Sequence, residues 1–321
     1  MKVALAHDPP VPDDPKEDVP EDYGAEYDDS ETVRALMDSI RASGHDAADL
    51  LLTPDFPEQL TRCAPDLVFN IAEGRQGAGR ESVVPSWLEF LDVPYTDSDA
   101  LTMALTLDKD MSKTLARARD IPTPRWACLE DRREIEFLDL EFPLFVKPNA
   151  EGSSMGIRRN SLVKDRDELK DVAGLVIKNY QQGCLVEEFL PGREFCAGFV
   201  GNEEPEALPI VEVRTEEGFY PYEDKSRHRK RLECPADIPA KLADEITELG
   251  RRAYHAFRCR DFARVDLKLN AEGRPEFLEI NPLPGLSPGF SIFPKQAEAA
   301  GMSHEKLIGR IIREARTRYR G

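Results

Sequence analysis

Two carboxylates, an arginine and an asparagine are spaced so that they share one face of a predicted β-hairpin. Residues 262–285 (FARVDLKLNAEGRPEFLEINPLPG) contain two runs typical of strands around the turn-forming pair Glu272-Gly273. With this pair at the centre of the turn, Asp266 lies opposite Glu279. Because strand side chains alternate, two sets of residues project from opposite faces. The first set is Arg264, Asp266, Glu279 and Asn281, and the second is Val265, Leu267, Leu278 and Ile280.

Carboxylates that face each other across a strand pair repel, and folding alone does not require them. A hard divalent cation with oxygen ligands makes the same arrangement favourable. We therefore predict a metal site on the face that carries Asp266 and Glu279. The alternative is a solvated acidic strand face.

Composition narrows the class of protein. A chain of 321 residues with 40% hydrophobic content should form two or three domains with real cores. Its formal charge of −18 argues against nucleic acid or an anionic membrane as a partner, although it could also reflect a high-salt host. The apolar run in the opening MKVALAHDPP is too short for a signal peptide. No stretch of the sequence approaches the length of a membrane helix, which needs about 20 apolar residues. The six scattered cysteines predict a reduced, cytoplasmic protein.

The strand and helix patterns in the rest of the sequence predict a mixed α/β protein around this hairpin. Alternating strand and helix patterns predict a small parallel sheet in the first 97 residues, with a loop rich in Pro and acids at 8–30. Here the expected strands are 2–6 and 66–71, and the expected helices are 32–42, with Ser30 as N-cap, and 82–91. Further strands are expected at 142–147, 184–189, 194–200 and 209–213, and further helices at 108–119, 167–180, 238–257 and 304–318.

A lysine and a loop of small residues form a candidate phosphate site. Lys147 ends an apolar strand, and the loop Gly152-Ser153-Ser154-Met155-Gly156 follows. Glycines let backbone N–H groups converge on phosphate oxygens, and a lysine supplies charge. The loop is neither the Walker pattern nor a GxGxxG after the first strand, which excludes P-loop NTPases and Rossmann dehydrogenases.

Three further features could bind a nucleotide, and each has a structural alternative. The segment Glu187-Glu188-Phe189-Leu190 suits an adenine slot, or is a strand end that leaves the core. Glu194 could accept from ribose hydroxyls or be exposed, and Lys109 could reach a phosphate or lie on the surface. The basic segment 225–231 could bind a nucleotide or carboxylate, or be a solvated loop. Neither zinc-ligand spacing nor a nucleophile motif is present.

Together these motifs resemble the ATP-grasp superfamily, and within it the D-alanine–D-alanine ligase family. The resemblance runs from Val68 to about Gly309. It is carried in order by Val93-Pro94-Tyr95-Thr96, Leu107-Asp108-Lys109-Asp110, Lys147-Pro148 with the glycine loop, Glu187 to Glu194, Arg264-Val265-Asp266, and Glu279-Ile280-Asn281-Pro282-Leu283-Pro284-Gly285.

The resemblance implies a three-domain α/β (α+β) ATP-grasp fold with the nucleotide held between two β-sheets. The implied domains are an N-terminal parallel α/β domain (1–97), a central lid domain (98–187) and a C-terminal catalytic domain (188–321). It also implies a cytoplasmic ligase that uses ATP and two Mg²⁺ (or Mn²⁺) ions, acts on small amino-acid or carboxylate substrates, and forms a homodimer.

The implied mechanism is phosphorylation of a carboxylate, followed by attack of an amine on the acyl phosphate. The metal ligands would be Asp266, Glu279 and Asn281, and the catalytic groups Arg264, Ser154 and Lys225. The nucleotide contacts would be Lys109, Lys147, Gly152, Ser153, Ser154, Glu187, Glu188, Phe189, Leu190, Glu194 and Lys225. The substrate contacts would be Glu26 at the amine, Glu73, and Gly285 with Ser291 at the second carboxylate.

Departures from the family pattern all concern the amino-acid substrates. Glu73 stands where the family carries a histidine, and Gly79-Arg80-Glu81-Ser82 replaces the usual Gly-Glu-Asp-Gly. Ser226 stands where a tyrosine is expected after Lys225. Two other functions therefore stay open: an ATP-grasp ligase for a different amino acid, peptide or acid, and a non-catalytic ATP-binding protein. An arginine beside the metal face argues against the second, because mere binding does not need it.

Overall fold

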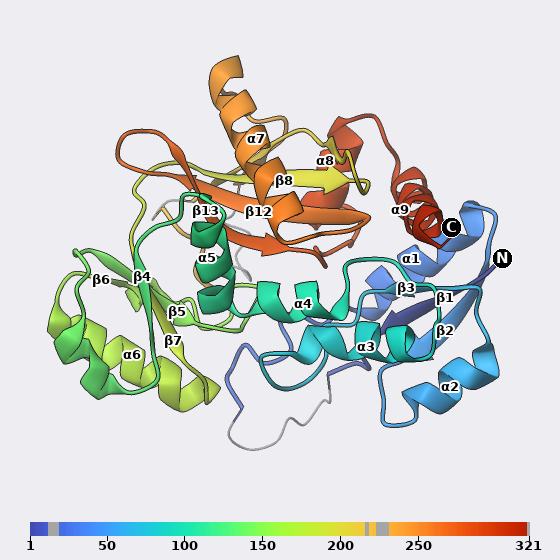
Figure 1. The fold of residues 1–321 in the computed structure, drawn as a ribbon, viewed down its shortest axis with the longest axis horizontal. Helices are drawn as coiled ribbons and strands as arrows, with labels where there is room; N and C mark the ends of the chain where they lie inside the picture. Colours follow the sequence, from blue (N-terminus) through green and yellow to red (C-terminus); the bar gives the residue numbers. More distant parts are fainter. Residues whose placement is uncertain (12–18, 216–217, 223–230, 320–321) are drawn as a thin grey trace.

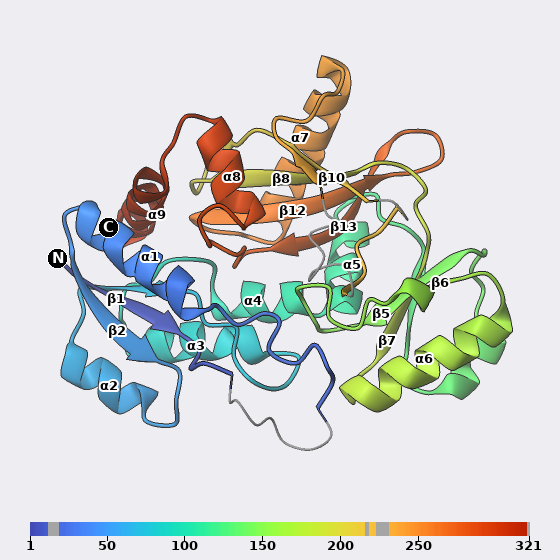
Figure 2. The same ribbon diagram turned by 180° about the vertical axis from the view of Figure 1, so that it is seen from behind.

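Within the part of the chain that the structure describes, three β-sheets form the framework (Figure 1). The computed structural model describes residues 1–11, 19–215, 218–222 and 231–319. Both termini lie at the same end of the molecule, beside the first sheet (Figures 1 and 2). No helix among these residues is long and apolar enough to cross a membrane.

The N-terminal sheet is parallel, with strand order β2-β1-β3, as the alternating pattern predicted. Its helix α1 begins after Asp29, whose carboxylate accepts a hydrogen bond from the Thr32 N–H at 2.7 Å. The predicted cap, Ser30, is instead the first helical residue. The elements are β1 (Lys2–His7), α1 (Ser30–Ala42), β2 (Asp46–Leu51), α2 (Phe56–Cys63), β3 (Leu67–Asn70) and α3 (Val83–Phe90).

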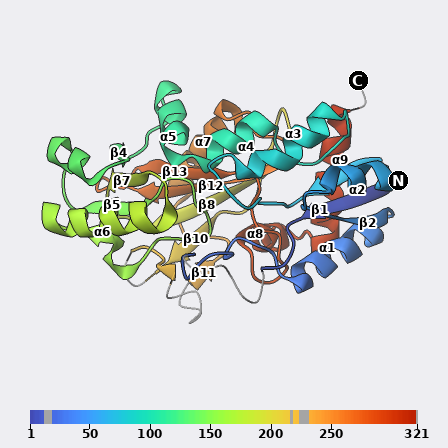
Figure 3. The ribbon, with the colours of Figure 1, turned by 90° about the horizontal axis from the view of Figure 1, so that it is seen from below.

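The central sheet is antiparallel, with order β4-β7-β5-β6, and α6 covers one of its faces (Figure 3). Two consecutive helices, α4 and α5, lead into it. Asp108 ends α4 and caps α5 by accepting from the Met111 N–H at 3.0 Å, which makes Lys109 the first residue of α5. The elements are α4 (Ala100–Leu107), α5 (Lys109–Ala118), β4 (Trp126–Leu129), β5 (Leu144–Pro148), β6 (Leu162–Val163), α6 (Arg166–Tyr180) and β7 (Cys184–Glu188).

The C-terminal sheet has the order β11-β10-β8-β12-β13, with β9 paired to β8. Helix α7 packs on one face, against Phe195, Ala197 and Phe199 of β8. Helix α8 packs on the opposite face, where Gln296 donates to the Cys196 carbonyl at 3.0 Å. The elements are β8 (Glu194–Val200), β9 (Glu206–Ala207), β10 (Val211–Arg214), β11 (Arg231–Glu233), α7 (Ala240–Ala256), β12 (Phe262–Leu269), β13 (Pro275–Asn281), α8 (Ile292–Ala299) and α9 (His304–Arg318).

The predicted hairpin is present, but its predicted pairing is confirmed only at the end far from the turn, which we call the open end. Asp266 pairs with Glu279 and Arg264 with Asn281, as expected. A bulge then shifts the register, so that Leu267 pairs with Phe277. Leu278, which was predicted to project with Val265, Leu267 and Ile280, lies at this bulge. It is half-buried and lines the cavity described below.

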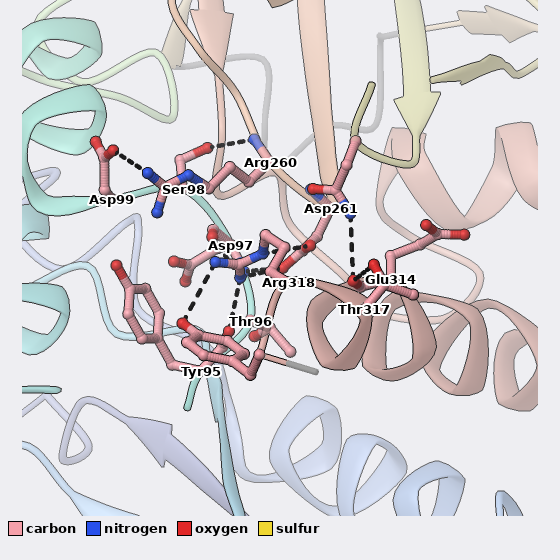
Figure 4. Close-up of polar contacts among 12 residues, drawn as sticks. Tyr95, Thr96, Asp97, Ser98, Asp99, Arg260, Asp261, Glu314, Thr317 and Arg318 are labelled. Atoms are coloured by element: carbon pink, nitrogen blue, oxygen red, sulfur yellow. Dashed lines mark hydrogen bonds and ion pairs between the residues drawn. The ribbon is translucent and has the colours of Figure 1, made fainter. Parts of the chain in front are cut away.

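A buried polar junction fixes the N-terminal sheet against the hairpin (Figure 4). Arg318 at the end of α9 donates to both carboxylate oxygens of Asp261, at 3.0 and 2.7 Å, and to the Tyr95 carbonyl at 2.7 Å. Asp261 also accepts from the Asp97 N–H at 2.9 Å. Burial raises the pKa of Asp97 well above its ordinary value. The junction joins the end of the first sheet, the start of β12 and the last helix.

Candidate active site

One cavity of about 510 Å³ lies between the central and C-terminal sheets. All of the site residues predicted from the sequence line it, apart from Lys225, which falls outside the described residues. They are Glu26, Glu73, Lys109, Lys147, Gly152, Ser153, Ser154, Glu187, Glu188, Phe189, Leu190, Glu194, Arg264, Asp266, Glu279, Asn281, Gly285 and Ser291. The cavity therefore gathers segments that are distant in the chain.

The predicted metal face lies at the open end of the hairpin. Asp266 receives a two-pronged contact from Arg264, with Nε to Oδ1 at 2.8 Å and Nη2 to Oδ2 at 2.7 Å. The Asn281 amide nitrogen donates to Asp266 Oδ2 at 3.1 Å, so its oxygen would face a cation after rotation of the amide. Two carboxylates and an amide oxygen are the donor set that Mg²⁺ or Mn²⁺ prefers, and the residues present fit such an ion.

Arg264 remains a cation within this cluster. Burial lowers the pKa of its guanidinium, but the charge and hydrogen bonds of Asp266 outweigh burial and raise the pKa overall. A fixed guanidinium beside the metal face can stabilise negative charge that develops on a reacting oxygen.

Two lysines and the glycine loop face this cluster. Lys109 lies 3.6 Å from Glu279 and donates to the Glu151 carbonyl at 2.5 Å. Lys147 is 6% exposed and lies 2.7 Å from Glu187 Oε1. In the loop, Ser153 and Ser154 both adopt the left-handed conformation, with φ of 50° and 61°. Non-glycine residues adopt this conformation infrequently, and such strain clusters at ligand-binding loops.

The predicted adenine slot is aromatic. The rings of Phe145 and Phe219 meet edge to face at 5.1 Å, and Phe189 lies 6.2 Å from Phe145. Lys268 lies 4.5 Å from the centre of the Phe189 ring and donates to the Gly218 carbonyl. Leu278, displaced by the bulge, adds an apolar side chain to the same cavity. Neither Lys268 nor Leu278 was assigned to the site from the sequence.

The end of the cavity predicted to bind amino acids is built around Arg80, which lies 2.6 Å from Glu26 and 3.2 Å from Glu151. Glu26, expected to anchor a substrate amine, also accepts from the Gly152 N–H. Glu73 and Glu81 lie beside this network, and their side chains hydrogen-bond to each other. Burial raises the pKa of Glu73 well above its ordinary value and that of Glu81 to about 7. Burial therefore favours the protonated form of both carboxyl groups.

At the other end, Ser291 lies against Gly285. A Cβ atom at Gly285 would fall 2.9 Å from Ser291 Oγ, so a larger residue would displace the Ser291 side chain. Ser291 Oγ accepts from the Ser287 N–H at 3.2 Å, and Ser291 precedes the first residue of α8. Backbone N–H groups at a helix start attract carboxylates.

Comparison with known proteins supports this geometry. The family profile described as "D-ala D-ala ligase C-terminus" matches residues 115–313. A D-alanine–D-alanine ligase of Aquifex aeolicus is 34% identical over 285 residues, covering 88% of this chain and 93% of that protein. The chain belongs to the D-alanine–D-alanine ligase family.

Further similar proteins extend the match. The protein y4sG of Sinorhizobium fredii is 41% identical over 271 residues, which are 83% of this chain and 79% of that protein. The crystal structure of the Bacillus anthracis D-alanine–D-alanine ligase superposes with a TM-score of 0.78 at 26% identity, covering 99% of both chains. Its complex with ATP gives a TM-score of 0.76, 24% identity and the same coverage. The fold is therefore the ATP-grasp fold of these ligases.

Proposed function

We propose that this protein is an ATP-dependent carboxylate–amine ligase that forms a dipeptide-type bond through an acyl phosphate and releases ADP and phosphate. The observation that carries the proposal is that Arg264, Asp266, Glu279 and Asn281 line the same cavity as Lys147 and the glycine loop. Relatives named D-alanine–D-alanine ligases, and one solved with ATP, support the same reaction class.

In this proposal the base of ATP lies among Phe145, Phe189 and Leu190, with Glu187 and Glu188 at its amino edge. Glu194 accepts from the ribose, while Lys109, Lys147 and the N–H groups of Gly152, Ser153 and Ser154 contact the phosphates. Asp266, Glu279 and Asn281 would hold Mg²⁺ or Mn²⁺, two ions in all. A bound divalent ion neutralises phosphate charge and polarises oxygens.

The chemistry then follows in two steps. A carboxylate oxygen of the first substrate attacks the γ-phosphorus, and the bond between that phosphorus and the bridging oxygen of ADP breaks. The amine of the second substrate attacks the acyl carbon, loses a proton and expels phosphate. Arg264 would donate to the oxyanion of the tetrahedral intermediate, and one such donor contributes roughly 3–4 kcal/mol. Gly285 and Ser291 would bind the carboxylate of the second substrate, while Ser154 and Lys225 would exclude water from the acyl phosphate.

The predicted first amino-acid subsite differs from the family pattern at Glu73 and Arg80. Arg80 pairs with Glu26 at 2.6 Å, and Asp28, Glu73 and Glu81 also line that end of the cavity. Another amino acid, a peptide or a different carboxylic acid is therefore the second candidate for the substrate. The arginine beside the metal face argues against a purely ATP-binding role, because binding ATP does not require Arg264 at this position.

We also propose three domains, at 1–97, 98–187 and 188–321, a cytoplasmic location and a homodimer. The three separate sheets support the first proposal. Six free cysteines and the use of ATP are in keeping with the second. The third follows from the family alone.

A phosphate-release assay with ATP and Mg²⁺ tests the ligase proposal. Substrates should include D- and L-amino acids, hydroxy acids and short peptides. We expect phosphate release that depends on one of these substrates, with a ligated product of matching mass. ATP binding without release for any of them would contradict the ligase proposal.

A further inference from the structure

Lys113 is a fully enclosed lysine behind the adenine slot. It lies one helical turn after Lys109 on α5, is 0% exposed and is not part of the cavity lining. Its Nζ lies 2.7 Å from Glu187 Oε2 and donates to Thr123 Oγ1 at 2.8 Å. Thr123 in turn donates to the Phe277 carbonyl at 2.8 Å, so Lys113 connects α5 with strands β7 and β13. A buried ammonium costs free energy unless it has such partners.

Glu187 has a cation on each carboxylate oxygen. Oε1 lies 2.7 Å from Lys147, and Oε2 lies 2.7 Å from Lys113. Burial alone would raise the pKa of Glu187, but the two lysines outweigh it and lower the pKa to about 2. Glu187 therefore stays ionised although it is only 3% exposed.

The two lysines differ in what a nucleotide can offer them. Lys147 lines the cavity beside the glycine loop, where phosphates would attract it. Lys113 lies outside the lining and is held by Thr123, so it keeps its contact with Oε2. If Lys147 turns to a phosphate, Oε1 loses its cation and becomes an acceptor for an N–H group of the base.

We propose that Lys113 is a positioning residue for the nucleotide. It holds the Glu187 carboxylate in place and balances its charge. Lys147 can then turn to the phosphates, and Glu187 Oε1 can accept a hydrogen bond from the amino group of adenine. This role rests on the proposed ATP site. It makes Lys113 a determinant of the preference for adenine, because guanine presents a carbonyl oxygen where adenine has its amino group.

The test measures binding of ATP and GTP by calorimetry in the full chain, without turnover. Lys113→Met should weaken ATP binding roughly 10- to 100-fold, since removing one partner of a buried charge pair is costly. GTP binding should weaken less, so the ratio of ATP to GTP affinity should fall. Lys178→Met, an exposed lysine on α6, is the matched control and should bind both nucleotides as the unmodified protein does.

A double variant separates positioning from general damage to the fold. Lys113→Met combined with Glu187→Gln leaves neither buried charge, and its ATP affinity should lie within about 3-fold of Glu187→Gln alone, because Lys113 acts through Glu187. The inference would be overturned if Lys113→Met lowered ATP affinity equally in the unmodified protein and in Glu187→Gln. An unchanged ratio of ATP to GTP affinity in Lys113→Met would also overturn it. Failure of the unmodified protein to bind ATP would instead refute the proposed function, and the role of Lys113 with it.

Discussion

Replacing Arg80 with methionine should destabilise the protein through the amino-acid end of the cavity. The Arg80 guanidinium is 6% exposed and contacts Glu26 at 2.6 Å, Glu151 at 3.2 Å and the Ala150 carbonyl at 2.7 Å. Removing one partner of a buried ion pair costs about 3–5 kcal/mol, because the remaining charge is uncompensated. Glu26 and Glu151 keep donors from the Gly152 N–H and Gln182, and both line the cavity. We therefore expect a loss of about 2–3 kcal/mol in the free energy of unfolding.

Urea unfolding at pH 7.5 measures this loss. Arg34→Met is the matched control, since Arg34 is exposed on α1, and it should change stability by less than about 0.5 kcal/mol. Adding Glu26→Gln to Arg80→Met should restore at least half of the loss by removing the orphaned carboxylate. An Arg80→Met variant as stable as the Arg34→Met control would refute the reasoning.

The remaining predictions concern specificity, pH and the buried junction. Glu73→Gln should change the relative kcat/KM for different amino acids by about 10-fold while the KM for ATP changes less than about 3-fold, as steady-state assays would show. For Glu81, burial raises the pKa from its ordinary value to about 7, so the native state binds a proton more tightly than the unfolded state, and stability is lost as the pH rises through about 7. Between pH 5 and pH 8, the free energy of unfolding should fall by roughly 2–3 kcal/mol less in Glu81→Gln than in the unmodified protein, as urea unfolding at both pH values would show. An equal decrease in the two proteins would contradict this assignment. Arg318→Met leaves Asp261 buried without its cation and should lower the free energy of unfolding by about 3 kcal/mol; a change below 0.5 kcal/mol would show that the junction is not stabilising.

The hairpin was predictable because its information is local. Alternation along the strands and the turn signal at Glu272-Gly273 predicted Asp266 opposite Glu279, and this pair is observed. Near the turn, however, the strands pair one residue away from the predicted register, and the bulge restores the predicted pairing from Asp266 onward. The bulge was not predictable from the same pattern, because it depends on how β12 fits between β8 and β13. Its consequence is that Leu278 belongs to the cavity.

The site residues that were not predicted depend on contacts between segments that are distant in the sequence. Arg80 and Glu26 are 54 residues apart, and no pattern in either segment indicates that they meet. Lys113 was not assigned to the site from the sequence, although it lies one helical turn after Lys109, because its pairing with Glu187 depends on how α5 is placed relative to β7. The elements that were missed are short, between 2 and 8 residues, and so give few repeats of any periodic pattern. They are β2, α2, α4, β4, β6, β9, β11 and α8.

The most direct test of the proposed ligase site is phosphate release by the Asp266→Asn variant with ATP, Mg²⁺ and the substrate pair found by screening. This substitution keeps the size of the side chain and removes the charge that the cation and Arg264 require. We predict at least a 100-fold lower rate and weaker binding of Mg²⁺-ATP. The free energy of unfolding should fall by about 2–3 kcal/mol, because Arg264 loses the charge of its partner but keeps an amide oxygen as acceptor. A variant that releases phosphate within 2-fold of the unmodified rate would contradict the assignment of this face to catalysis.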